Sequence, residues 1–309
     1  MAQKLEKKTA RILALILAFI MLGSVFAYIS PKGVQEKRDV KLKIEDFRNW
    51  IDILPENGLF YYFNLTELGL LSKKLGDKDP LVNFTEEGAI NALHSAYLSG
   101  RIVQFSHPIE EFVYADYGYP LYLIDNNDSK VFFARDTNNT VGNFDVQFSK
   151  YGVAMISEVS PLVIGYSPLV IEVAEKLNSR KTEYSDYLLR LNDTFVFAFF
   201  TYGKKAGEVF RMNQTNDSIA DFFFQGFRYN STSQQYEKVW GVHFTQNYFF
   251  TGINESERGF EYYHFENFDD GFSIAVMGDK NFTKIADERT APPVMGFIIK
   301  EVEEVPQKE

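Results

Sequence analysis

The sequence predicts an α+β protein in which an N-terminal transmembrane helix precedes an ectodomain of antiparallel sheets with helices packed on one side. Three observations lead to this prediction. An uncharged apolar run covers residues 12–31. Segments with helical spacing of apolar residues follow it, and they alternate with short aromatic and β-branched runs separated by Gly, Pro, Asn and Asp.

The apolar run is long enough to cross a bilayer, because twenty helical residues at ~1.5 Å each span about 30 Å. We expect residues 12–29 to form the anchor and residues 1–11 to stay in the cytoplasm. Basic residues dominate this start: Lys4, Lys7, Lys8 and Arg11. A cleaved signal peptide is the alternative, since Val25 and Ala27 are small enough for a signal peptidase, and it would give a secreted protein. Both interpretations export the rest of the chain.

A polar, mixed-charge stretch over residues 30–43 suits a solvated stalk. The first half of the ectodomain then covers residues 44–160. Helices are expected at 44–54, 66–75 and 85–98, the last two capped by Thr66 and Thr85. A buried strand is expected at 58–65, and strands and hairpins over 101–157.

The second half, residues 161–302, repeats this order with different residues. Helices are expected at 168–177 and 183–191, a strand at 194–203, and hairpins from residue 221 onward. The parallel suggests a duplicated unit and two similar subdomains. Residues 303–309 are charged and aperiodic, as is typical of a frayed tail.

The acceptor pattern for N-glycosylation, Asn-x-Ser/Thr, supports export. Composition predicts roughly two such triplets by chance, and the sequence has many more. They begin at Asn64, Asn83, Asn127, Asn138, Asn192, Asn213, Asn216, Asn230, Asn254 and Asn281. A second explanation stays open, because Asn, Ser and Thr also gather in turns and helix caps for backbone reasons.

Composition excludes several functions. With no cysteine, the chain has neither a disulfide nor a lipidated-cysteine anchor. A net charge of -10 argues against a nucleic-acid partner, because phosphate binding needs a basic face. No glycine-rich phosphate loop occurs, so neither a nucleotide nor another cofactor is expected.

Ser167 is the candidate nucleophile. The segment at 161–177 has the order strand, Gly-Tyr-Ser turn and helix, as in a nucleophile elbow, although Leu169 stands where that motif needs a small residue. A triad would need His243 or His264 and an acid from Asp269 or Asp270. Ser167 is equally suited to capping a helix, so an anchored hydrolase is the alternative function.

Metal sites receive little support. The four histidines are His94, His107, His243 and His264, and no two have the spacing of a local zinc motif. Four residues resemble positions 1, 3, 5 and 12 of a calcium loop, but Lys130 replaces the glycine of its sharp turn. These weak candidates are Asp125, Asn127, Ser129 and Asp136. An Asx-rich hairpin tip explains them equally well.

Aromatic residues concentrate at 222–229, 247–250 and 260–268. Such rings can stack on sugars, so a glycan- or peptide-binding surface is a second alternative. Aromatic residues at strand spacing more commonly build a sheet core.

The anchor KKTARILALILAFIMLGSVFAYIS and the PLVIG-turn-helix segment resemble the N-terminally anchored, uncharacterised surface proteins of archaea. The resemblance implies a compartment and transfers no catalytic residue. Together these observations predict a glycosylated cell-surface protein, anchored in the lipid bilayer through residues 12–29. We expect a structural or binding role as an accessory subunit, with an envelope protein or a glycan as partner.

Overall fold

The computed structural model describes residues 38–126, 130–179, 184–191, 193–209, 218–254, 259–287 and 289–296. Twelve of the described strands form one antiparallel sheet, and helices pack on it, which confirms the α+β class. The predicted anchor at 12–29 lies outside the described residues. Within them, no helix combines the length and the apolar character that a membrane span needs.

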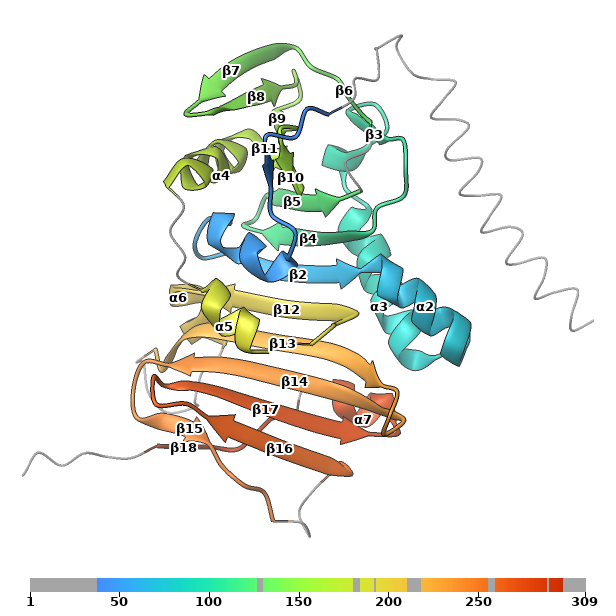
Figure 1. The fold of residues 1–309 in the computed structure, drawn as a ribbon, viewed down its shortest axis with the longest axis vertical. Coiled ribbons are helices and arrows are strands. Elements are labelled where there is room, and N and C mark those ends of the chain that lie inside the picture. Colours follow the sequence, from blue (N-terminus) through green and yellow to red (C-terminus); the bar gives the residue numbers. More distant parts are fainter. Residues whose placement is uncertain are drawn as a thin grey trace, which may run out of the picture.

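Twelve strands form a continuous sheet whose order brings both halves of the chain together (Figure 1). Every pairing in it is antiparallel. From one edge to the other the strands are β16 (Tyr262–Asn267), β17 (Phe272–Asp279), β14 (Gln235–Phe244), β13 (Ala220–Asn230), β12 (Phe197–Tyr202), β2 (Leu59–Asn64), β4 (Glu111–Asp116), β5 (Pro120–Asp125), β11 (Leu162–Tyr166), β9 (Val153–Ile156), β8 (Phe144–Phe148) and β7 (Thr137–Val141).

The two predicted subdomains therefore share one sheet. Strand β2 of the first half pairs with β12 of the second, with Phe60 opposite Phe200 and Phe63 opposite Phe197. Both strands are almost continuously apolar, and aromatic rings meet across this seam. We call the β2–β12 pairing the seam, because it is where the two halves join.

Helices cover both faces of the sheet, so the prediction that they pack on one side is wrong. One face packs on η1 (Phe47–Ile53), α4 (Ser167–Ser179) and α5 (Ser185–Arg190). The other packs on α2 (Leu65–Leu75), α3 (Pro80–Leu93), α6 (Lys204–Val209) and α7 (Phe282–Ala286). Figure 1 shows η1 and α5 in front of the strands and α7 behind them.

The physical reason for two covered faces lies in the central strands. Successive strand residues point to opposite faces, so a strand that is apolar throughout has two faces to bury. In β2, Phe60 and Tyr62 enter one core while Phe63 enters the other. The short elements η2 (Ala96–Leu98), β1 (Leu42–Lys43) and β10 (Val159–Ser160), and the small pairs β3 (Val103–Phe105) with β6 (Val131–Phe133) and β15 (Tyr248–Phe250) with β18 (Val294–Gly296), complete the fold.

The predicted stalk at 30–43 is wrong for residues 38–43. Strand β1 pairs in parallel with β10, and the Arg38 side chain is buried. Its guanidinium donates to the carbonyl oxygens of Ser157 and Val159 and to the Asn126 side chain. A long cation with five donors can satisfy several carbonyls at once, which fastens this entry segment to the sheet.

Helix capping also differs from the prediction. Asn64, and not Thr66, caps α2, since its Oδ1 accepts from the Glu67 N–H at 2.8 Å. Helix α3 begins earlier than predicted, at Pro80, because the Asp79 carboxylate accepts from the first amides of the helix. Thr85 therefore lies inside the helix and is buried.

Candidate functional site

Ser167 is the first residue of α4. It is held by the backbone of the turn that connects β8 and β9. Its Oγ donates to the Gly152 carbonyl oxygen at 2.8 Å, and its own N–H donates to the same oxygen at 3.1 Å. Gly165, two residues earlier, allows close strand packing, because a Cβ there would lie 2.6 Å from the Pro120 oxygen. These contacts explain the strand, Gly-Tyr-Ser turn and helix at residues 161–177 as structural features, and they do not require Ser167 to be a nucleophile.

The structure does not bring the predicted triad together. Ser167 follows β11, whereas His243 is on β14, and five strands of the sheet separate β11 from β14. At about 4.8 Å per strand this separation is roughly 29 Å. His264 on β16 is farther still. The hydrolase alternative therefore has no triad of the predicted composition.

The weak calcium candidates are only partly described. Asp125 ends β5, and Asp136 precedes β7 and donates its N–H to the Phe148 oxygen. Asn127 and Ser129 lie outside the described residues. Within the part of the chain that the structure describes, no group of three or more acidic or histidine side chains is arranged to hold a metal ion.

Six glycosylation acceptors fall on described residues, and four of them have an exposed asparagine. These are Asn83 in α3, Asn138 in β7, Asn254 after β15, and Asn281 before α7. Asn83 differs in its hydroxyl residue, since Thr85 is 0 % exposed and no hydrogen-bond partner for its Oγ1 is found among the described residues. A glycosylating enzyme that must contact the hydroxyl group of the acceptor triplet could reach Thr85 only before α3 packs on the sheet.

Three acceptors use the asparagine side chain for backbone structure, as the turn-and-cap explanation expects. Asn64 and Asn281 cap helices α2 and α7. Asn230 closes a turn by accepting from the N–H groups of Thr232 and Ser233, and its Nδ2 donates to Glu237. Asn127, Asn192, Asn213 and Asn216 lie outside the described residues.

A pocket of about 400 Å³ opens at one end of the seam, and we call it the seam pocket. Its walls include Arg48 from η1, Tyr62 and Asn64 from β2, Glu111 from β4, and Asp193 before β12. The Tyr62 hydroxyl donates to Glu111 at 2.5 Å and accepts from Asn64 Nδ2 at 3.2 Å. The Phe47 ring stacks on Tyr62 with centroids 3.8 Å apart.

Charge in the seam pocket is arranged in local pairs. Arg48 donates to both carboxylate oxygens of Asp46, and Arg228 pairs with Asp193 and Glu237. Burial raises the pKa of Glu111 to about 7, against the opposing hydrogen bond from Tyr62. The pocket therefore presents an amide, a phenol and a carboxyl group that changes protonation near neutral pH.

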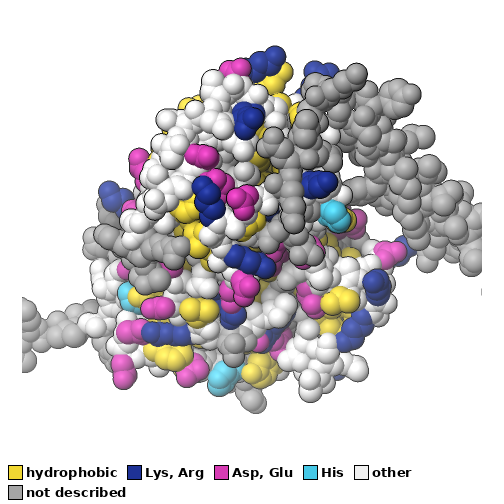
Figure 2. Space-filling model, turned by 45° about the horizontal axis from the view of Figure 1, so that its top comes forward, with side chains coloured by type: hydrophobic (Ala, Val, Ile, Leu, Met, Phe, Trp, Pro, Cys, Tyr) yellow, Lys and Arg dark blue, Asp and Glu magenta, His cyan; other side chains and the backbone are white. Residues whose placement is uncertain are grey.

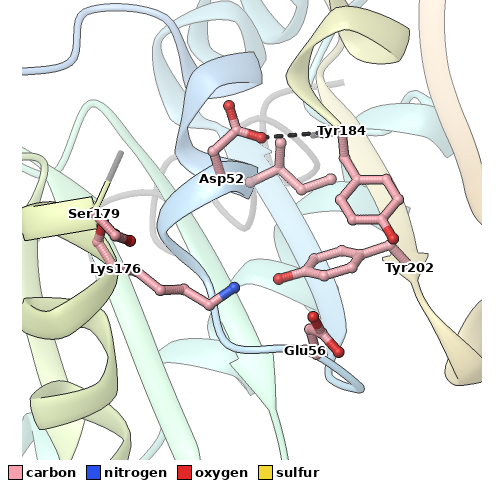
Figure 3. Close-up of a pocket in the computed structure, with 7 residues that line it drawn as sticks. Asp52, Glu56, Lys176, Ser179, Tyr184 and Tyr202 are labelled. Carbon is pink, nitrogen blue, oxygen red and sulfur yellow. Dashed lines mark hydrogen bonds between the residues drawn. The ribbon is translucent and has the colours of Figure 1, made fainter. Parts of the chain in front are cut away.

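A second pocket, of about 290 Å³, is lined by residues of η1, α4 and β12 (Figure 3). In Figure 3 the Lys176 ammonium extends toward the Tyr202 hydroxyl, with Glu56 below it. The Tyr184 and Tyr202 rings stack with centroids 4.4 Å apart. Tyr202 donates to the Leu54 oxygen, and Asp52 accepts from backbone amides at the start of α5, so these polar groups serve the fold.

The AF_2048_N model, described as a family N-terminal domain, matches residues 43–177. An uncharacterised protein of the archaeon Archaeoglobus fulgidus is 42 % identical over 296 residues, which cover 94 % of each chain. The chain belongs to this archaeal family. No solved structure matches it.

The family N-terminal domain accounts for the first half of the sheet together with η1 and α4. The seam pocket crosses its boundary, because Tyr62 and Glu111 lie within the matched region and Asp193 lies beyond it. In this family member the pocket therefore needs both halves of the chain. The predicted relationship to uncharacterised archaeal proteins is confirmed. This comparison does not test the predicted membrane anchor.

His243, named above with Asp270 as a possible triad member, lies beside Asp221 and Tyr187, which the sequence did not predict as its neighbours. His243 Nδ1 lies 2.5 Å from Asp221 Oδ1, and Nε2 lies 2.9 Å from the Asp270 carbonyl oxygen. The Tyr187 ring stacks on the imidazole with centroids 4.7 Å apart. The hydrogen bond with Asp221 raises the pKa of His243. The register of β13 against β14 places Asp221 near His243, while helix α5 supplies Tyr187 and the turn before β17 supplies Asp270, so no local motif signals this group.

The aromatic segments are divided between core and surface. Phe222, Phe223, Phe224 and Phe227 of β13 are buried. In β16, Tyr262 is exposed, whereas Tyr263 and Phe265 pack against the core. Figure 2 shows hydrophobic side chains scattered among charged ones on the face that it presents. The described aromatic residues mainly build the sheet.

Proposed function

We propose that the chain is a membrane-anchored, N-glycosylated protein of the archaeal cell surface, with a structural or binding role beside a larger envelope complex. The observation that carries this proposal is the excess of glycosylation acceptors downstream of an apolar run of membrane-spanning length. Four of the six described acceptors have an exposed asparagine, where a glycan would extend into solvent.

A non-catalytic role agrees with the chemistry of the described residues. Ser167 donates to a backbone oxygen, and His243 is engaged through both ring nitrogens in a distant part of the sheet. Nucleophilic catalysis by a serine requires a base within hydrogen-bond reach of its hydroxyl group. The predicted pair does not have that geometry.

The first experiment is intact-mass analysis with glycopeptide mapping of the protein from native membranes. We expect a mass that retains residues 12–29 and glycans on several asparagines. A mature chain that starts near Tyr28 would replace the anchored form with a secreted one. If every asparagine is unmodified, surface glycosylation is wrong and the turn-and-cap explanation accounts for the acceptor triplets.

Glycan binding in the seam pocket is a second candidate function. The stacked rings of Phe47 and Tyr62 stand beside the polar groups of Asn64 and Glu111, a combination that suits a polyhydroxylated ligand. The test is a thermal-shift titration with glycans released from the archaeal surface. The Tyr62→Phe variant, which keeps the ring and removes the hydroxyl, should abolish the shift, and no shift with the parent chain would reject this candidate.

A further inference from the structure

Strand β7, which forms one edge of the twelve-stranded sheet, has no charged residue. Its sequence is Thr-Asn-Asn-Thr-Val, and its first four residues are exposed. At the end near the turn, Asn178 of α4 donates to the Val141 oxygen. Among the described strands, β7 pairs with β8 alone, so its other side presents backbone groups that could pair with another strand.

The opposite edge of the sheet is protected in the ways that natural edge strands use. Strand β16 carries His264 and Glu266. The segment around β15 is also fastened to it, because Asn267 exchanges two hydrogen bonds with the Phe250 backbone and Tyr263 donates to the Thr251 oxygen. Charges and covering segments of this kind prevent edge-to-edge association. Strand β7 has no such charge.

Strand β7 instead contains a complete and accessible glycosylation acceptor. Asn138 and Thr140 are both exposed, and Asn138 has neither the capping role of Asn64 nor the turn role of Asn230. Asn138 is the second residue of β7 and lies opposite Gln147 in the register.

We propose that a glycan on Asn138 prevents edge-to-edge pairing of β7 with a second copy of the chain. This inference rests on the proposed function, since it requires a glycosylated surface protein. The glycan replaces one hydrogen of Asn138 Nδ2 and is transferred from a lipid-linked oligosaccharide, whose phosphate-bearing carrier leaves. A partner strand must approach to about 4.8 Å, and a branched sugar rooted on β7 occupies that space.

The absence of cysteine allows a direct test. In antiparallel pairing of two β7 strands about a two-fold axis at Asn139, the two Asn139 Cα atoms would lie about 4.5–5.5 Å apart, a separation that a disulfide can bridge. Asn139→Cys keeps the acceptor triplet, because its middle residue is free to vary. The full chain carrying this substitution is expressed in its archaeal host, with and without Asn138→Gln, and cells are treated with a mild oxidant.

We expect a disulfide-linked dimer in the double variant and a monomer in the glycosylated single variant. A matched control combines Asn139→Cys with Asn254→Gln, which removes an acceptor far from this edge in the sequence and should leave the chain monomeric. Equal cross-linking with and without the Asn138 acceptor would overturn the proposal, as would an absence of cross-linking in every variant.

Glycopeptide mapping of the same samples separates the two proposals. If Asn138 is unmodified while other asparagines carry glycans, the edge-protection proposal fails and the proposed function stands. If all asparagines are unmodified, both fail.

Discussion

The carboxylate of Asp52 caps helix α5, whose N-cap residue Tyr184 lies 132 positions later in the chain. Asp52 Oδ1 accepts from the backbone N–H groups of Tyr184 and Ser185, each at 3.2 Å. Helix α5 has no side-chain cap from its own N-cap residue, so η1 of the first half supplies one. This contact links the two halves on the face opposite α2 and α3.

Asp52→Ala should lower the free energy of unfolding by about 1 kcal/mol, the usual cost of losing an N-cap acceptor. Asp52→Asn keeps an acceptor oxygen and should cost less. Urea unfolding of the full chain measures both values. Hydrogen exchange should locate the loss in Ser185–Arg190, and an equal effect of the two substitutions would show that charge, rather than capping, is responsible.

Lys238→Met should destabilise the protein by about 1–3 kcal/mol, because it removes the charged donor of two partly buried hydrogen bonds. The Lys238 side chain is 1 % exposed, and its ammonium donates to the Asp287 and Thr290 oxygens. Faster hydrogen exchange around residues 289–294 should accompany the loss. Lys280→Met, at a surface lysine, is the matched control and should change neither quantity.

Ser167→Ala should lower stability by about 1 kcal/mol or less through loss of the bond to the Gly152 oxygen. A fluorophosphonate probe, which labels activated serines, should leave Ser167 unmodified in the parent chain. Mass spectrometry of the labelled chain decides this. Adduct formation at Ser167 would restore the hydrolase alternative.

Sequence patterns predicted the class of the fold better than its connections. The run at 58–65 was correctly assigned to a strand, and helices 66–75 and 168–177 closely match α2 and α4. The second covered face was missed, although a strand with apolar residues at every position indicates burial on both sides. Helix α3 was placed too late because the Asp79-Pro80 start signal was overlooked.

The sites could not have been found by local spacing. Tyr62 and Glu111 are 49 residues apart, and strand pairing alone makes them neighbours in the seam pocket. The Asp221 and His243 pair likewise depends on the β13–β14 register. A one-residue register shift would turn either partner to the other face, so only the three-dimensional fold determines these contacts.

Glu111→Gln should stabilise the protein above pH 7 and have little effect below about pH 4.5. Burial raises the pKa of Glu111 to about 7 in the folded state, so ionisation becomes increasingly costly between these values. After allowance for partial solvent screening, we expect the substitution to raise the free energy of unfolding by about 1–2 kcal/mol at high pH. The measurement is the free energy of unfolding of the parent chain and the variant as a function of pH. The control is Glu110→Gln, a substitution at the exposed neighbouring residue. A pH-independent effect would contradict this assignment.

His243→Gln should have its largest destabilising effect at low pH. The carboxylate of Asp221 and the Asp270 carbonyl oxygen can only accept, so both ring nitrogens must donate, and this favours the imidazolium. Its pKa is raised in the folded state, first by the Asp221 hydrogen bond. The stabilisation is therefore complete below the unfolded pKa of about 6.5 and is lost as the pH rises through the folded value.

We expect a difference of about 1 kcal/mol between the parent chain and His243→Gln at low pH, since Asp221 is partly exposed. The measurement is the free energy of unfolding of both chains across this pH range. His264→Gln, at an exposed histidine of β16, should show no such trend. If the difference for His243→Gln stays constant with pH, the histidine stabilises the sheet through ring packing on Tyr187 and not through its charge.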